Sequence, residues 1–229
     1  MDKAEKRHIL RSLPLFKGLS SDQLRILDQC AKHKTYNAGD LIASENETMQ
    51  TLYIVAEGKI KIFKSSTEGK EQTIYLFGPG EPFCIYSAIT DHTFPASAMA
   101  LEKSSILVFP RDIIQDMAQN EPALLFNALL VLSRRLKECM GLIETLALKE
   151  IPQRLASFLL HSTATEKGEE KDLLQMNITQ RELAKILGTT PETLSRVLRK
   201  MASDGLIAME GRIIRILSRQ NLERLASGY

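Results

Sequence analysis

Side chains that could contact a nucleic acid duplex cluster near the C-terminal end of the sequence. On a helix, Arg196 could donate two parallel hydrogen bonds to guanine O6 and N7, and Glu192 could accept one from cytosine N4. Ser195 could serve a base or a phosphate, while Arg199 and Lys200 are better placed for backbone phosphates. A charged, solvated helix without a ligand is the alternative interpretation. The candidate contact residues are Thr179, Gln180, Thr190, Glu192, Thr193, Ser195, Arg196, Arg199, Lys200 and Arg212.

Two short helices must position these side chains. The run Thr179-Gln180-Arg181-Glu182 has the pattern of a capping box, which marks a helix start, and Gly188 is typical of a residue that ends a helix. Thr190 can cap a second helix with Pro191 at its first position. Two short helices joined by a tight glycine turn predict a helix-turn-helix, whose second helix lies in the major groove of DNA.

A hairpin is predicted directly after the second helix. The runs 206–209 and 212–217 are strand-like, and Glu210-Gly211 between them has the composition of a two-residue turn. Such a hairpin would form the wing of a winged helix, with Arg212 at its tip near phosphate, and the run 219–226 would close the domain as a helix. Residues 177–229 contain nine Lys or Arg and five Asp or Glu, so this segment carries a net charge of +4. A positive surface suits contact with phosphates and weakens the alternative of a helix without a ligand.

A heptad pattern precedes this segment. Apolar residues follow the alternating spacing of four and three that is typical of a helix pairing with another helix. The seam consists of Leu125, Leu129, Leu132, Leu136, Cys139, Ile143 and Leu146. We expect these residues to form a dimer interface, although a single core-facing helix is the alternative. A second apolar edge, predicted to pack on the N-terminal domain, consists of Phe126, Leu130, Val131 and Leu142. Pro152 disfavours helix in the residue before it, so 149–151 is predicted to be a hinge.

The first half of the sequence has the pattern of short strands. Apolar alternations at 51–55, 59–63 and 72–77 are separated by glycine-containing turns, and among residues 13–110 only 21–31 is predicted to be a helix. Many short strands at close spacing predict an antiparallel β-roll.

The composition excludes several classes of protein. The 229 residues carry a net charge of +2, and the three cysteines are too far apart for a disulfide framework or a zinc ribbon. The N-terminus has no secretory pattern, and no run approaches the apolar length needed to cross a membrane, so we expect a cytoplasmic protein without a membrane partner. An enzyme is a rival class. However, the sequence shows no paired catalytic carboxylates, no phosphate-binding loop and no metal-binding His-Glu helix.

Over nearly its whole length, the chain resembles the CRP/FNR superfamily of bacterial transcription regulators. The resemblance includes the segments LPLFKGLSSDQL, AGDLIASENE, LYIVAEGKIKIF and FGPGEPF and, most specifically, ITQRELAKILGTTPETLSRVLRKMASDGLI. It implies that Glu192, Ser195 and Arg196 match a Glu-x-x-Ser-Arg arrangement that reads TTGA-like half-sites in a palindrome. The subgroup of cyclic-AMP receptors carries Arg immediately before this Glu, whereas this chain has Pro191.

The expected sensor segment departs from the known subgroups. Relatives that bind cyclic nucleotides carry a Gly-Glu pair just after the turn that corresponds to FGPGEPF, and an Arg-Ser or Arg-Thr pair further on. At these two positions this chain reads FCIYSA (83–88) and FPAS (94–97), so cyclic AMP is not expected to be the effector. Only Cys30 lies before the roll, so one subunit cannot supply four cysteines to an iron–sulfur cluster. The segment 83–87 is similar to the haem-binding stretch of carbon-monoxide sensors. Haem-dependent nitric-oxide regulators lack both the cyclic-nucleotide motif and the iron–sulfur motif, as this chain does. The candidate effector-binding residues are Phe83, Cys84, Tyr86, Ser87, His92 and Pro95. The alternative is that these residues only line or fill the core of the roll.

The sequence therefore predicts an α+β protein with an N-terminal antiparallel β-roll of the cupin-like jelly-roll type. The expected domains are an effector-sensing roll (1–120), a dimerisation helix and hinge (121–150) and a winged helix-turn-helix (151–229). We expect a homodimer that binds a palindromic operator on double-stranded DNA, contacts RNA polymerase and activates stress-response genes. The effector would act by shifting the population of two states of the dimer. A regulator that responds to an organic small molecule, or a winged-helix module that binds protein, is the alternative.

Overall fold

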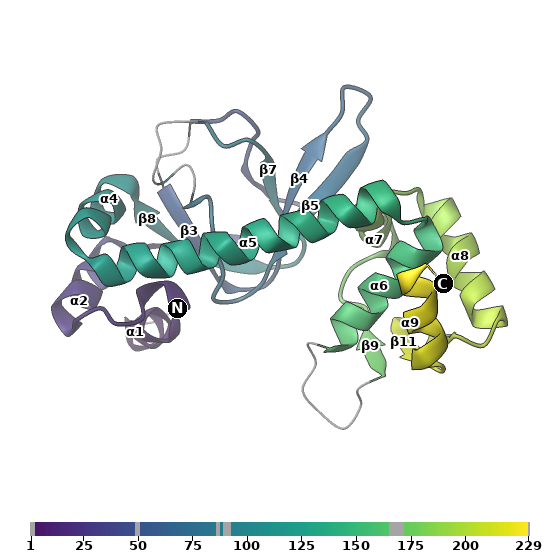
Figure 1. Cartoon of the computed structure of the whole chain (residues 1–229). Helices are drawn as coiled ribbons and strands as arrows, with labels where there is room; N and C mark the ends of the chain where they lie inside the picture. Colours follow the sequence, from purple (N-terminus) through teal and green to yellow (C-terminus); the bar gives the residue numbers. More distant parts are fainter. Residues whose placement is uncertain (1–2, 49–50, 86–87, 89–92, 165–171, 229) are drawn as a thin grey trace. The chain divides into compact units, whose positions relative to one another are not determined.

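The computed structural model describes residues 3–48, 51–85, 88, 93–164 and 172–228, and no placement is given for the others (Figure 1). By its internal contacts the chain divides into two units, Met1–Glu138 and Cys139–Tyr229. Within the described residues, no helix combines the length and the apolar character that crossing a bilayer requires.

The described strands of the N-terminal unit form two antiparallel four-stranded sheets. One sheet has the strand order β1-β8-β3-β6 and the other β2-β7-β4-β5. The predicted strands at 51–55, 59–63 and 72–77 correspond to β3, β4 and β5, so the predicted antiparallel roll is confirmed. The strands are β1 (Lys32–Tyr36), β2 (Leu41–Ala43), β3 (Thr51–Glu57), β4 (Ile60–Ser65), β5 (Glu71–Phe77), β6 (Pro82–Phe83), β7 (Ser97–Ala100) and β8 (Ser104–Pro110).

Strand β3 is buried on both faces. Successive side chains of a strand point to opposite sides. Tyr53 and Val55 pack into the roll interior, whereas Leu52 and Ile54 pack into a second core beneath the helices of this unit. Both cores therefore depend on the same strand, which explains why its sequence is almost continuously apolar.

The turn between β3 and β4 requires a glycine. Gly58 has a φ of +86°, and a Cβ built there would lie 2.3 Å from Ser104 Oγ and 2.7 Å from the carbonyl oxygen of Lys103. Any side chain at this position would collide with Ser104, the first residue of β8, and with the backbone of Lys103 just before it.

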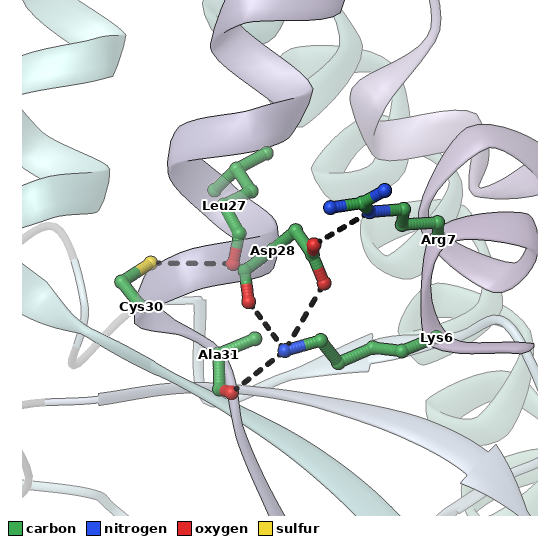
Figure 2. Close-up of polar contacts among 6 residues, drawn as sticks. All are labelled: Lys6, Arg7, Leu27, Asp28, Cys30 and Ala31. Atoms are coloured by element: carbon green, nitrogen blue, oxygen red, sulfur yellow. Dashed lines mark hydrogen bonds and ion pairs between the residues drawn. The ribbon is translucent and has the colours of Figure 1, made fainter. Parts of the chain in front are cut away.

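Two N-terminal helices, α1 (Lys3–Ser12) and α2 (Ser21–Cys30), flank a short 3-10 turn, η1 (Pro14–Phe16). Figure 2 shows the polar contacts that join α1 to the end of α2. Asp28, 6% exposed, pairs with Arg7 Nε at 2.8 Å and with Lys6 Nζ at 3.1 Å. Lys6 also donates to the backbone carbonyls of Asp28 and Ala31. Burial raises the pKa of Asp28, but the hydrogen bonds and charges of Arg7 and Lys6 outweigh burial and lower it below its usual value.

Helices α4 (Arg111–Asn120) and α5 (Pro122–Leu148) follow the roll. The sequence predicted α2 at 21–31 and the long helix, but it gave no sign of α1 or α4. The predicted second edge of α5 is partly wrong, because Phe126 is 61% exposed and Leu130 is 52% exposed. Leu124 and Ala128 are buried in the helix-side core instead, with Val131 packed beside them.

The C-terminal unit has its own hydrophobic core, formed by residues from 155 to 226. A break between the two helices is present at 149–150, because α5 ends at Leu148 and α6 begins at Ile151. Ile151, which the sequence placed in the hinge, is the first residue of α6 instead, and hinge motion stays a prediction. Among the described residues, β9, β10 and β11 form an antiparallel sheet of order β10-β11-β9. The elements of this unit after α5 are α6 (Ile151–Ala164), β9 (Leu173–Gln175), α7 (Gln180–Leu187), α8 (Pro191–Ser203), β10 (Ile207–Glu210), β11 (Ile213–Ile216) and α9 (Arg219–Ser227). Helix α6 ends at Ala164, and residues 165–171 lie outside the described part of the chain.

Candidate nucleic-acid interface and effector pocket

Helices α7 and α8 form the predicted helix-turn-helix. Thr179 Oγ1 accepts a hydrogen bond from the Glu182 backbone N–H at 3.2 Å, which is one half of the predicted capping box. Gly188 ends α7 in the left-handed conformation with a φ of +65°. Thr190 then caps α8, because its Oγ1 accepts from the Thr193 backbone N–H at 3.3 Å, and Pro191 occupies the first helical position. Local signals therefore fix both the turn and the start of the second helix.

Helix α8 separates a buried face from a charged face. Its buried face is formed by Leu194, Leu198 and Met201. The exposed face carries Glu192, Arg196, Arg199 and Lys200, and Ser195 is half-buried at its border. The four exposed residues follow the spacing of one helix face, so all of them can meet the same surface of a ligand.

The exposed face is organised by short polar contacts. Arg196 Nη2 donates to Thr193 Oγ1 at 3.2 Å. The pKa of the Glu192 carboxyl is lowered. The largest cause is a hydrogen bond from its own backbone N–H, and a hydrogen bond from Thr190 and the charges of Arg196 and Arg181 lower the pKa further. Glu192 is therefore a carboxylate acceptor at neutral pH. The sequence reasoning missed Arg181, an exposed cation whose only signal was its place inside the capping box.

The predicted hairpin is present, but its turn is shifted by one residue. Glu210 pairs with Ile213, so the two turn residues are Gly211 and Arg212 instead of Glu210 and Gly211. Gly211 has a φ of +61°, which a tight hairpin requires at its first turn position. Arg212 remains at the exposed tip, as predicted. Thr179 and Gln180 are exposed at the start of α7.

The candidate dimer seam lies mainly on the exposed side of α5. Cys139 and Leu146 are half-buried. The other five seam residues are 39% to 66% exposed: Leu125, Leu129, Leu132, Leu136 and Ile143.

The candidate effector residues fall into different environments. Phe83 and Cys84 are buried in the roll interior, whereas Pro95 is exposed. Tyr86, Ser87 and His92 lie outside the described residues. Aromatic rings fill the interior beside Phe83, which stacks on Tyr53 at 5.0 Å between ring centroids and lies 5.5 Å from Phe77.

One cluster at the edge of the roll was missed by the sequence reasoning. Arg135 of α5 lies over the rings of Tyr75 and Phe77, with its Cζ 3.8 Å and 4.4 Å from their centroids. Its Nη2 donates to Glu81 Oε1 at 3.0 Å, and its Nη1 lies 3.5 Å from Glu138 Oε2. Burial is the largest effect on the Glu81 carboxyl and raises its pKa. The cluster links the long helix to the roll within the N-terminal unit, and its only sequence signal was a basic pair in an apolar helix.

Cys84 does not fit the role of an iron ligand in this packing. Burial raises the pKa of its thiol, so the thiol is neutral, whereas the thiolate is the metal-binding form. Its φ of +59° is unusual for a side-chain-bearing residue. Phe94 and Ala96 belong to the same hydrophobic core as Cys84.

A β-roll followed by a long helix and a winged helix-turn-helix defines a DNA-binding transcription regulator with an effector-binding domain. Residues 33–121 match the cyclic nucleotide-binding domain family, and residues 153–225 match the Crp-like helix-turn-helix domain family. The chain belongs to the CRP/FNR family, as the sequence motifs predicted.

Relatives agree over nearly the whole chain. The cyclic AMP receptor protein of Thermus thermophilus is 31% identical over 219 residues, which cover 96% of this chain and 99% of the relative. The fumarate and nitrate reduction regulatory protein of Vibrio cholerae is 28% identical over 211 residues, covering 91% of this chain and 84% of the relative. The structure of FixK2 from Bradyrhizobium japonicum has a TM-score of 0.76 at 22% identity, covers 85% of this chain and 96% of FixK2, and supports the fold alone. The V. cholerae relative is named as a regulatory protein, and with the helix-turn-helix family match this confirms the predicted class of DNA-binding transcription regulator.

Proposed function

We propose that two copies of this chain pair through the α5 seam and read a palindrome of TTGA-like half-sites with their α8 helices. The observation that carries the proposal is the exposed face of α8, which carries Glu192, Arg196, Arg199 and Lys200. The opposite face of the helix is buried in the core of the C-terminal unit. A helix so anchored presents a rigid set of donors and acceptors to the major groove.

Each side chain of this face has a distinct role. Arg196 donates to guanine O6 and N7, and Glu192 accepts from cytosine N4. Ser195 and Thr193 flank them, while Arg199, Lys200 and the wing residue Arg212 contact phosphates. At the N-termini of α7 and α8, Thr179, Gln180 and Thr190 lie where helix dipoles favour phosphate.

The base-reading role is tested with two arginine variants of the same helix. Binding of the parent protein to a random duplex library first identifies the operator. On that duplex, Arg196→Ala costs about 1–3 kcal/mol per half-site and relaxes preference at one base pair. Arg199→Ala is the matched control, because losing a phosphate contact weakens all sequences similarly and lowers the salt dependence by about one ion. A parent without sequence preference, or an Arg196→Ala variant with the parent's preference, contradicts the proposal.

The β-roll binds the effector that controls DNA binding. An organic ligand that contacts the aromatic interior beside Phe83 would reach Arg135 through Phe77, and thus the long helix. The relative from T. thermophilus is named for cyclic AMP. This chain lacks the arginine that would pair with the nucleotide phosphate near Pro95, so we propose an effector other than cyclic AMP.

Two measurements separate the possible inputs. Titration calorimetry with cyclic AMP gives no saturable heat if the effector is different, whereas tight binding that raises operator affinity contradicts this part of the proposal. The alternative input is haem-mediated sensing of nitric oxide. An absorption spectrum after haem addition tests it, because a Soret band that shifts with nitric oxide would favour haem over an organic effector.

The remaining parts of the proposal concern organisation and context. The chain consists of a sensing roll (1–120), a dimerisation helix with its hinge (121–150) and a winged helix-turn-helix (151–229). The dimer acts in the cytoplasm and contacts RNA polymerase as an activator of stress-response genes. Purified polymerase added to a transcription reaction with the operator upstream of a promoter tests this, because the protein must increase transcript yield.

A further inference from the structure

The side chain of Arg154 joins the ends of two helices in the C-terminal unit. Its Nε donates to the carbonyl oxygen of Lys149 at 2.8 Å, and its Nη2 donates to that of Leu146 at 2.9 Å. Its Nη1 donates to the carbonyl oxygen of Leu187 at 2.9 Å. One guanidinium therefore contacts the last turn of α5, the hinge and the last residue of α7.

These carbonyls are the acceptors that helix ends leave without partners. The backbone N–H of Glu150, which would continue the α5 ladder to Leu146, donates to Gln153 Oε1 at 2.7 Å instead. Leu187 is the last residue of α7, before the glycine turn. The positive charge of Arg154 also faces two helix C-termini, where the helix dipole favours a cation.

The contact to α7 reaches close to the DNA-reading helix. Leu187 is separated from Pro191 of α8 only by the turn 188–190. Leu155 of α6, Leu187 and Leu194 of α8 share one core, so these three helices form a packed block. The helical backbone is interrupted at 149–150, between the end of α5 and this block, and Arg154 bridges the interruption.

We propose that Arg154 is a positioning residue that fixes the angle between the end of α5 and α8. In a symmetric dimer this angle sets the distance and rotation between the two α8 helices. Arg154 thereby determines which spacing of half-sites the dimer accepts. This inference rests on the proposed dimeric DNA binding and adds a residue that does not touch DNA.

The test measures binding as a function of half-site spacing. Fluorescence anisotropy is recorded with a series of duplexes whose half-sites are moved by −2 to +2 base pairs from the parent's optimum. We expect the parent to lose about 100-fold in affinity at a shift of two base pairs, because the second half-site is then misplaced in distance and rotation. In Arg154→Met, which keeps the stem but removes every donor, we expect this penalty to fall about tenfold. Affinity for a single half-site is expected to be unchanged in this variant, because α8 itself is intact.

Two further variants make the result specific. Lys149→Met also removes one cation from the hinge, but the Lys149 side chain contacts Ser157 Oγ on α6 at 2.9 Å and not the carbonyl of α7. It should keep the parent's spacing profile. Arg154→Lys keeps the charge but has one nitrogen, which cannot span carbonyls of both helices, so its profile should also broaden.

Each outcome decides between the two proposals. A parent that binds no operator contradicts the proposed function itself. A parent with a sharp optimum, together with an Arg154→Met variant that has the same optimum and penalty, overturns the role of Arg154 alone. If Arg154→Met does not give a cooperative thermal transition, Arg154→Lys decides, and a parent-like profile in that variant overturns the inference. Equal broadening by Lys149→Met also overturns it.

Discussion

Replacing Leu136 by Glu tests the proposed pairing of α5 most directly. Leu136 is 65% exposed in the single chain, the largest exposed fraction among the seam leucines. Burying a whole leucine side chain contributes about 1.5–3 kcal/mol, so covering this remaining surface contributes about 1–2 kcal/mol per chain. A symmetric dimer contains the position twice, so the substitution removes about 2–4 kcal/mol before any repulsion between the two carboxylates is counted.

This loss corresponds to a 30-fold to 1,000-fold increase in the dimer dissociation constant, taking about 1.4 kcal/mol per factor of ten. Sedimentation velocity over a range of protein concentrations measures the change. Operator affinity should fall with it, because a monomer reads only one half-site. Gly141→Glu is the matched control, since position 141 lies away from the seam and a Cβ there has open space. An Leu136→Glu protein that remains a dimer at the parent's dissociation constant would refute the seam as the interface.

Two further predictions concern the stability of the N-terminal unit. Asp28→Asn should lower the free energy of unfolding by about 1–3 kcal/mol at neutral pH, because it leaves two cations beside a neutral amide and one of them is solvent-exposed. The Asp28 pKa is lowered in the folded state, so its contribution is present above about pH 4, the usual unfolded pKa, and is lost as pH falls below it; urea titrations of parent and variant should converge there. Gly58→Ala should lower stability by about 3 kcal/mol or more, because the new Cβ collides with Ser104 as well as straining the backbone. Gly69→Ala, at a similar φ of +78° but with open space, should cost only about 1–2 kcal/mol in the same chemical denaturation assay.

Both stability predictions have contrary outcomes that are easily recognised. A constant difference between Asp28→Asn and the parent from pH 7 to pH 3 would show that ionisation of Asp28 has no part in the effect. Equal losses for the two glycine variants would show that backbone strain alone matters at Gly58.

Local signals in the sequence predicted the reading end of the molecule well. The Thr179 and Thr190 caps and the Gly188 turn depend on neighbours within four residues, so a sequence pattern contains all the information they need. The wing turn was misplaced by one residue because Glu210 can continue the strand as easily as it can enter the turn. Only pairing with Ile213 decides this.

Features that depend on distant partners were not predictable. Helix α1 is held by Asp28, which is 22 residues from Lys6 and 21 from Arg7, and the sequence of α1 itself has only the pattern of a charged N-terminus. The heptad seam could be recognised in the sequence, but the heptad pattern does not show which neighbouring face of the helix packs on the N-terminal unit. Leu124 and Ala128 are buried there in place of Phe126 and Leu130.

The same limit applies to two arginines. Arg135 contacts rings of β5, and Arg154 contacts the end of α7. Both partners are too distant in the sequence for the periodicity of a helix or a strand to indicate the contact. The sequence shows the residue types but not the acceptors. Where an arginine lies among apolar helix residues, the fold is needed to show what its donors contact.

The shared strand β3 also constrains how such a sensor can diversify. A substitution at Leu52 or Ile54 changes the packing of the core beneath the helices, and one at Tyr53 or Val55 changes the packing of the roll interior. Substitutions at all of these positions must therefore conserve side-chain volume. Strand β5 is only partly buried along its length. Over evolutionary time, new effector preferences should therefore arise first at β5 positions such as Tyr75, while β3 changes slowly across descendants that bind different ligands.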